Sequence, residues 1–382
     1  MSEAVAAAVG AIDRVDEARA LAARLFVEPT IALDSEGDGM FRYRTQLCTI
    51  QLASADELWV VDTLAPGLSV SVFAELMSSR GPEKVVHDAA FDARLLAAYG
   101  APLGAVFDTA VAARFLGFAA TGLASLLLQL FDVSVPKHMQ QEDWAKRPLS
   151  AEAIEYLEND VRYLIPLRDV LLERLRERDI EAEMREECEY VLREALRSEF
   201  EPSPFSRVKG ALARPPEERA RLYELALARD EIARELDLPA ARVVPNDLLL
   251  RFGELHQPMR AELERRLPSR HRSYASRFLD ALERAEGHVD APTPELPNPH
   301  DIPSATELAR RKRRRELLTN FRAREASARG VDPQVVFPGH CVNELVKLDG
   351  LAREQLESVS GFGECRIERY GEAMRRAFKG RW

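Results

Sequence analysis

The stretch "TIALDSEGDG", Thr30 to Gly39, places the carboxylates Asp34 and Glu36 two residues apart, directly after a short apolar run. Three strand-like runs separated by polar breaks follow one another here: 30–34, 46–53 and 57–63. Helical and strand-like patterns then alternate: helix 68–81, strand 83–88, helix 89–100 and strand 104–109. Consecutive strands followed by alternating helices and strands predict an α/β domain with a mixed sheet.

The composition is that of an ordinary water-soluble protein with room for two or three domains: 382 residues, 46% hydrophobic and 30% charged. No apolar run approaches the roughly 18–20 residues needed to cross a bilayer. The alanine-rich segment 1–26 lacks a basic start and predicts a surface helix, not a signal peptide. Four dispersed cysteines form no CxxC, so we expect neither disulfides nor a zinc cage, and a cytoplasmic protein: Cys48, Cys188, Cys341 and Cys365.

The net charge of −10 is unevenly distributed along the chain. Residues 1–200 carry 20 basic and 34 acidic side chains, whereas residues 201–382 carry 33 basic and 29 acidic ones. The densest positive cluster is "RRKRRR", Arg310 to Arg315. This cluster could contact phosphate groups, or it could be the solvated face of a helix.

Two breaks divide the second half of the chain into helical segments. Residues 200–210, "FEPSPFSRVKG", and the proline-rich 291–303 have the composition of linkers. The segments on either side of the second linker resemble each other at an offset of 93 residues, which indicates a duplicated helical domain of about 80 residues. We therefore expect four parts: a first domain over 1–203, a helical domain over 210–290, a linker over 291–303 and a second helical domain over 304–382.

Five side chains are candidates for a shared site. Asp34 and Glu36 lie on one side of a strand at its carboxyl end, where α/β sheets bind ligands. Asp92 is in the first turn of a helix that follows a strand, while Tyr156 and Asp160 are one helical turn apart. Each motif also has a plain structural explanation. These are a polar turn after a strand, an acid favoured by the helix dipole, and the rim of an amphipathic helix.

In this order over one α/β domain, these five residues resemble the tyrosine subgroup of the DEDD exonuclease superfamily. The histidine subgroup would place its base five residues before the last Asp, where this chain has Glu155. The segments "YRTQLCTIQLA", "VFDTAVAARFLG", "GLASLL" and "KHMQQEDWAKRPLSAEAIEYLENDVRYLIPL" narrow the resemblance to the ribonuclease D family. The C-terminal duplication resembles tandem HRDC domains, the second through "FGECRIERYGEAM".

The resemblance implies a ribonuclease H-like mixed-sheet exonuclease domain followed by two small all-α HRDC domains. It also implies a 3′–5′ exoribonuclease that hydrolyses 3′-terminal phosphodiesters to nucleoside 5′-monophosphates, in tRNA 3′ maturation and stable RNA trimming. Asp34, Glu36, Asp92 and Asp160 would hold two divalent ions, with Asp34 bridging them, and all-oxygen ligands favour Mg²⁺ or Mn²⁺. Tyr156 would orient the attacking water.

The matched segment before the last motif also implies contacts to the substrate. Lys137, Gln140, Trp144 and Arg147 are the candidates, although a surface lysine and a core tryptophan are equally ordinary explanations. The stretch "GDGMFRY" departs from relatives that place an aromatic residue directly after the glutamate. Met40 and Phe41 are the candidates to wedge against the terminal base.

We expect the partner to be RNA with a single-stranded 3′ end, such as a tRNA precursor, with no membrane involved. No dimerisation heptad is present, so we expect a monomer. The two HRDC domains could bind RNA, or they could be spacers or protein-docking modules. The alternative functions are a 3′–5′ DNA exonuclease and a non-catalytic RNA-binding protein on a decayed nuclease fold, because motif spacing does not reveal contacts to the 2′-hydroxyl.

Overall fold

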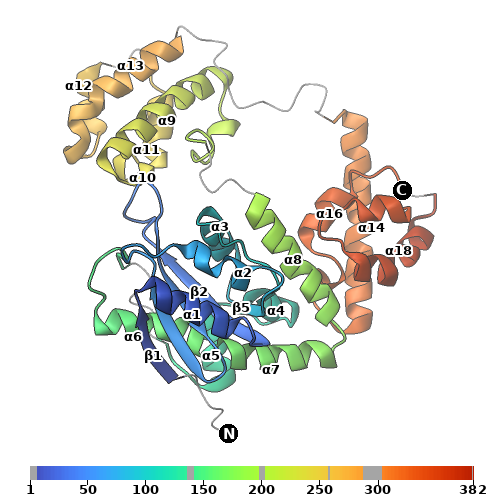
Figure 1. Cartoon of the computed structure of the whole chain (residues 1–382). Helices are drawn as coiled ribbons and strands as arrows, with labels where there is room; N and C mark the ends of the chain where they lie inside the picture. The colour runs from blue at the N-terminus through green and yellow to red at the C-terminus, as the bar shows by residue number, and fades with distance from the viewer. Residues whose placement is uncertain (1–6, 136–141, 198–202, 257–258, 287–302, 381) are drawn as a thin grey trace. The chain divides into compact units, whose positions relative to one another are not determined.

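The computed structural model describes the chain except for residues 1–6, 136–141, 198–202, 257–258, 287–302 and 381 (Figure 1). The chain divides into two compact units. The first unit comprises Met1–Glu36, Leu47–Ser198 and Pro303–Trp382, and the second comprises Gly37–Gln46 and Glu199–Ile302. The short segment that follows Glu36 therefore belongs with the first helical copy, although the sequence places it inside the first domain.

The first unit contains a mixed six-stranded sheet in the order β1-β4-β3-β2-β5-β6. Its strands are β1 (Ala7–Ile12), β2 (Thr30–Gly37), β3 (Leu47–Ala53), β4 (Glu57–Asp62), β5 (Glu83–Val86) and β6 (Val106–Asp108). The pairs β1–β4, β2–β5 and β5–β6 are parallel and β3–β4 is antiparallel. The predicted α/β domain with a mixed sheet is confirmed, and β2 lies between β3 and β5.

The prediction of a surface helix over 1–26 is wrong for its first half. Ala7–Ile12 forms β1, which pairs in parallel with β4, and the helix α1 begins only at Val15 and ends at Leu25. Alanine favours helices by less than about 1 kcal/mol per residue over most others. An unpaired edge of β4 offers a row of backbone hydrogen bonds that outweighs this preference.

Helices pack around the sheet and complete the first domain. They are the 3₁₀ helix η1 (Val70–Phe73), α2 (Ala74–Met77), α3 (Ala90–Ala98), α4 (Thr109–Phe115), α5 (Leu123–Phe131), α6 (Ala151–Arg162), α7 (Leu164–Glu177) and α8 (Glu181–Arg197). Ser150 caps α6 as expected, its hydroxyl accepting from the Ala153 N–H at 3.1 Å. The inner leucines of α7, including Leu167 and Leu171, are fully buried in one core with Phe107 of β6. No described helix could serve as a membrane span.

The C-terminal helices of the first unit form a small all-α domain with its own aromatic core. They are α14 (Ala305–Arg329), α15 (Pro333–Val336), α16 (Gly339–Leu345), α17 (Arg353–Glu357) and α18 (Glu364–Phe378). The ring of Phe321 contacts the rings of Phe337, Tyr370 and Phe378, with centroid distances between 5.6 and 6.5 Å. This core stabilises the domain around the long helix α14.

The basic cluster 310–315 lies in α14, and several of its guanidinium groups are used within the domain. The Arg314 side chain is buried, donates to Val346 O at 3.1 Å and lies over the Trp382 ring. Arg311 pairs with Glu307 at 2.8 Å. The cluster is therefore not a uniform phosphate-binding surface, because Arg314 serves the core.

The second unit is the first helical copy. Its elements are η2 (Ala211–Ala213), α9 (Pro216–Leu236), α10 (Ala240–Val243), α11 (Asn246–Gly253), α12 (Arg260–Arg266), η3 (Ser269–Tyr274) and α13 (Ala275–Glu286). The segment 37–46 is anchored on α9 by the Tyr43 hydroxyl, which donates to Asp230 at 2.7 Å, and by Arg42, which pairs with Asp237 at 2.8 Å.

Positions matched by the 93-residue offset play equivalent parts in the two helical copies. Leu249, Phe252 and Leu263 are buried in the first, and Val342, Leu345 and Leu356 are buried in the second. The arginines of the match also act alike. Arg229 donates to the Val244 carbonyl and Arg322 to the Pro333 carbonyl, each near the turn after the long helix.

Candidate active site

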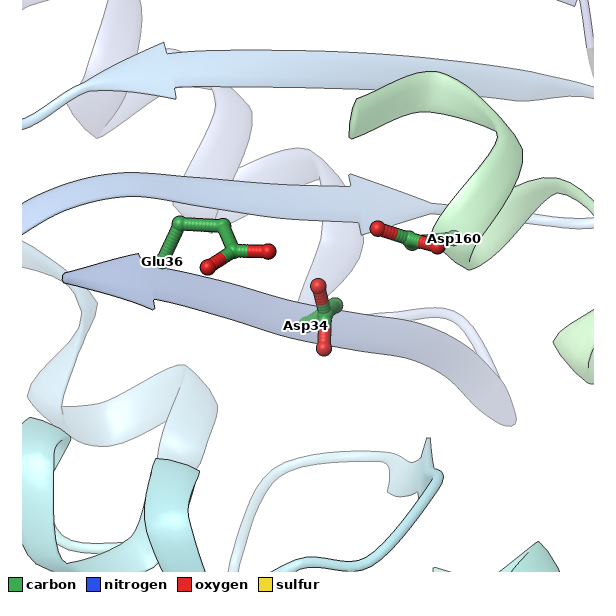
Figure 2. A group of neighbouring side chains, drawn as sticks. All are labelled: Asp34, Glu36 and Asp160. Atoms are coloured by element: carbon green, nitrogen blue, oxygen red, sulfur yellow. The ribbon is translucent and has the colours of Figure 1, made fainter. Parts of the chain in front are cut away.

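Three carboxylates converge at the carboxyl end of β2. The ligand oxygens of Asp34, Glu36 and Asp160 all lie within 4.8 Å of one another. Asp34 and Glu36 project from the same side of β2, and Asp160 approaches from α6 (Figure 2). The alternation of side chains along a strand produces the first pair, and the i, i+4 spacing on α6 places Asp160 beside Tyr156.

The cluster is electrostatically strained in the absence of a cation. Burial, followed by repulsion from Asp34, Asp160 and Asp92, raises the pKa of Glu36 to about 9. Burial also raises the pKa of Asp160 to about 7, and raises that of Asp34 well above its usual value with Asp160 adding to the effect. Buried like charges cannot all ionise without a compensating cation, so this donor set fits a hard divalent ion.

Asp92 lies beside the cluster, in the first turn of α3. Its carboxylate accepts a hydrogen bond from the Ser35 hydroxyl at 2.5 Å, and the side chain is buried. Burial and then the charge of Asp34 raise its pKa well above the usual range, while the bond from Ser35 acts in the opposite direction. Ser35 thus points away from Asp34 and Glu36 and connects β2 to α3.

The turn that leads into α3 is held by a buried aspartate. The Asp108 carboxylate accepts from the backbone N–H groups of Asp88 and Ala89, at 3.1 and 2.9 Å, and also from Ala110 and Val111 at the start of α4. Asp88 has a φ of 65°, a left-handed conformation that aspartate tolerates better than most residues. Asp108 therefore fixes the start of α3, which carries Asp92.

Tyr156 is held between the acids and the core. Its hydroxyl is hydrogen-bonded to Asp160, and its ring stacks on that of Trp144 at a centroid distance of 5.6 Å. Burial and the neighbouring carboxylates, Asp160 first, raise the pKa of Tyr156. The phenol is therefore protonated at neutral pH and acts as a hydrogen-bond donor.

Asp34, Glu36, Asp160 and Tyr156 open into one cavity of about 380 Å³, which is within the size range of small-ligand pockets, whereas Asp92 is not among its lining residues. It is lined by Asp34, Glu36, Tyr156, Asp160, His87, Val135 and residues 122–125. Gly122–Ser125 come from the start of α5, and Leu123 and Val135 contribute apolar surface. Charged groups and apolar surface therefore share one pocket, as a nucleotide requires.

The four predicted substrate contacts have different environments in the structure. Lys137 and Gln140 lie outside the described residues. Trp144 is 2% exposed and packs behind Tyr156, so its indole has no free face for a base in this conformation. Arg147 forms a two-point ion pair with Asp62, both distances being 2.6 Å, and also donates to Cys48 O at 2.9 Å, which ties the segment before α6 to the sheet.

The wedge candidates Met40 and Phe41 both belong to the second unit. Phe41 lies beneath the Arg242 guanidinium, 4.9 Å from the ring centroid, and Met40 is half exposed. The pocket residues that the sequence did not name as site candidates are His87, Val135 and residues 122–125, although the last four lie within the quoted segment "GLASLL". For His87 the only signal was a histidine directly after a strand, next to its last buried valine, Val86.

Comparisons with known proteins match the chain in two places. A 3′–5′ exonuclease family matches residues 9–176, and the HRDC domain family matches residues 311–377. Ribonuclease D of Granulibacter bethesdensis is 30% identical over 298 residues, covering 75% of this chain and 74% of that protein. Ribonuclease D of Desulfotalea psychrophila is 32% identical over 236 residues, 61% of this chain, and the chain spans only 63% of its length.

The fold matches that of Escherichia coli RNase D, with a TM-score of 0.71 at 23% identity over 97% of this chain and 98% of that one. That protein is described as an exoribonuclease involved in structured RNA processing. The family matches, the fold and the carboxylate cavity are those of a 3′–5′ exonuclease domain followed by a helical region that contains an HRDC domain. The similarity of the chain to individual relatives identifies the family more specifically. The chain belongs to the ribonuclease D family of 3′–5′ exoribonucleases.

Proposed function

We propose that this chain hydrolyses the 3′-terminal phosphodiester of RNA with the help of two divalent ions, Mg²⁺ or Mn²⁺, and releases nucleoside 5′-monophosphates. The observation that supports this most directly is the convergence of three carboxylates and one tyrosine in a single cavity of an exonuclease domain. A decayed nuclease would have no reason to keep mutually repelling acids together in a buried site.

In this proposal the acids are the ligands. Asp34 would contribute to both ions, Glu36 and Asp160 would complete the first, and Asp92 would serve the second, directly or through water. Bound ions would activate a water and stabilise the charge on the leaving 3′-oxygen. The raised pKa values of the acids mean that they give up protons as cations bind.

Tyr156 would orient the attacking water. Its hydroxyl hydrogen is directed to Asp160, so the lone pairs of the phenol oxygen are free to accept a hydrogen bond from water. Trp144 would fix the ring by stacking, which makes it a positioning residue in place of a direct base contact. The partly buried side chains of Leu123 and Val135, which line the cavity, offer an apolar surface for the terminal base.

We further propose an RNA with a single-stranded 3′ end, such as a tRNA precursor, as the substrate and a monomer as the active form. The first helical copy, over 210–290, is proposed to be an HRDC domain like the one matched at 311–377, since equivalent positions are buried in both. Both copies are proposed to bind RNA, because the second half of the chain carries the excess of basic residues.

The test uses a 5′-labelled single-stranded oligoribonucleotide, Mn²⁺ or Mg²⁺, and the full chain. A ladder shortening from the 3′ end, abolished by chelator, is expected. Asp34→Asn and Asp160→Asn should each lower the rate by more than about 100-fold, because loss of an outer-shell partner alone typically costs 10- to 100-fold in metal affinity or activity. Glu155→Gln, an exposed change on the same helix as Asp160, is the matched control.

Wild-type rates in either asparagine variant would refute the metal-ligand assignment. Faster digestion of a matched DNA oligonucleotide than of RNA would indicate a DNA exonuclease. Binding of RNA without any shortening, at all metal concentrations, would indicate the non-catalytic alternative.

A further inference from the structure

The histidine in the pocket has one ring nitrogen occupied and one free. His87 Nδ1 lies 2.9 Å from the Thr109 hydroxyl, and that hydroxyl lies 2.9 Å from the Val86 carbonyl. A carbonyl only accepts, so the single hydroxyl hydrogen of Thr109 is used on Val86. His87 Nδ1 must therefore carry a hydrogen and donate it to Thr109.

This arrangement fixes the tautomer of the imidazole. Burial lowers the pKa of His87, against the opposing effect of Asp108 and Asp88, so the ring is neutral at physiological pH. With the hydrogen on Nδ1, a neutral ring has a bare lone pair at Nε2. The structure thus presents a hydrogen-bond acceptor of fixed direction.

The acceptor faces the cavity. His87 lines it together with Asp34, Glu36 and Asp160, and no described residue hydrogen-bonds Nε2. His87 is only partly buried, so the ring is not sealed from solvent. Among the described residues the group of converging ligand atoms comprises Asp34, Glu36 and Asp160, and His87 is not part of it.

A 3′-terminal nucleotide offers few donors to such an acceptor. Phosphate and ring oxygens only accept, and the donors on the bases differ among the four nucleotides. The ribose hydroxyls are the donors common to every RNA residue, and the carboxylates that would hold the metal ions at the scissile phosphate line the same cavity as His87. An enzyme that removes successive nucleotides meets these hydroxyls at every step.

We propose that His87 is a specificity-determining residue whose Nε2 accepts a hydrogen bond from a hydroxyl of the 3′-terminal ribose, with Thr109 as the positioning residue that fixes its tautomer. This inference rests on the proposed exoribonuclease function and adds the group that reads the sugar. A site that hydrogen-bonds a substrate hydroxyl discriminates against the analogue that lacks it.

The test compares three oligoribonucleotides that differ only in the terminal sugar: ribose, 2′-deoxyribose and 3′-deoxyribose. Single-turnover removal of the last nucleotide gives a preference ratio for each missing hydroxyl. The wild-type chain should prefer ribose over one of the two deoxy substrates by about 3- to 10-fold, the effect expected of a single neutral hydrogen bond. The substrate that is disfavoured identifies the hydroxyl.

Two variants of His87 separate its two nitrogens. In His87→Asn the amide N–H takes the place of Nδ1–H and can still bond Thr109, but nothing occupies the position of Nε2, so the preference ratio should fall to about one. In His87→Gln the amide oxygen takes the place of Nε2, so the ratio should be largely retained. If the role of His87 were merely structural, neither variant would change the preference ratio. His87→Asn, which keeps the bond to Thr109, would then simply be more stable than His87→Gln.

Thr109 provides the control on the tautomer. Thr109→Val keeps the buried shape but removes the acceptor for Nδ1, so the ratio should fall, whereas Thr109→Ser should keep it. Thermal unfolding confirms that each variant is folded, and if His87→Asn does not fold, the Thr109 pair decides. An unchanged ratio in His87→Asn or in Thr109→Val overturns the inference, as does a wild-type chain with no preference. A wild-type chain that fails to shorten RNA at all overturns the proposed function instead.

Discussion

Arg366 of α18 is the charged residue whose removal should cost the first unit most. Its side chain is fully buried, with a 3.0 Å ion pair to Glu186 and a 2.9 Å hydrogen bond to the Glu183 carbonyl, both on α8. A further hydrogen bond reaches Val335 O at 3.3 Å. This guanidinium is therefore a fully buried polar link between the C-terminal helical domain and α8, beside the pairs that Arg329 and His340 make with Glu183 and Glu187.

The cost of replacing Arg366 by methionine follows from what is left behind. Methionine preserves much of the packing volume, but the Glu186 carboxylate loses a donor, and so do four carbonyls, those of Glu183, Val335, Gly361 and Phe362. Breaking a buried pair by removing one partner costs about 3–5 kcal/mol. Glu186 retains 16% exposure and a 2.6 Å hydrogen bond from Cys365 N, which softens the loss. We therefore expect the lower end of that range, about 3 kcal/mol.

The assay is equilibrium urea unfolding of the full chain, followed by circular dichroism and tryptophan fluorescence. Arg353→Met is the matched control: Arg353 pairs with Glu357 at 2.9 Å and also with Glu364, but these side chains are about half exposed, so its loss should cost much less than the loss of Arg366. If both variants unfold at the same urea concentration, the buried pair contributes no more than a surface pair and the reasoning is wrong.

Three further predictions concern the rest of the chain. Lys84 is buried with its Nζ 2.6 Å from Ser78 O, and burial lowers its pKa to about 8. The folded protein then binds fewer protons than the unfolded chain between pH 8 and about 10.5, so the free energy of unfolding should rise over that window, by at most about 3 kcal/mol, relative to Lys84→Met. Mn²⁺ at 100 times its Kd should stabilise the wild type by about 2.7 kcal/mol in thermal unfolding, and a chelator or Asp34→Asn should abolish the shift. Tyr43→Phe removes the 2.7 Å bond to Asp230 and should lower the protection of α9 against hydrogen exchange by about 1 kcal/mol, whereas an unchanged exchange rate would show that segment 37–46 is not held by this bond.

The sequence predicts the elements whose patterns are strong. The apolar alternation of β2, the glycine-closed helix α3 and the Ser150-capped helix α6 are all present, and these three elements carry the acids. The strand β1 was missed because its alanines have no β-type signature and only the partner β4 makes them a strand.

The predicted linker 200–210 shows a second limit of pattern reasoning. Phe205 and Val208 stand alone among prolines, serines and charges, yet both are buried in the core of the second unit. Isolated apolar residues carry no periodicity, so their burial depends on a surface formed by distant helices. The same holds for Trp144, which is buried in a small core formed by residues from β3, β4 and α6, including Tyr156.

The site likewise contains residues that a sequence pattern reveals and residues whose role depends on partners far away in the sequence. The carboxylates of the site can be found from the sequence because a cation requires several acidic residues at fixed spacings. Their mutual repulsion makes such a cluster costly, so it rarely has a purely structural use. The role of His87 is set instead by Thr109, 22 residues away, whose hydroxyl is committed to a backbone carbonyl. Replace Thr109 by a residue that donates to Nδ1, and the same histidine would present a donor to the pocket. Whether a residue offers a donor or an acceptor to a substrate thus depends on its hydrogen-bond partners as much as on its type. For His87 those partners can be identified only from the three-dimensional structure.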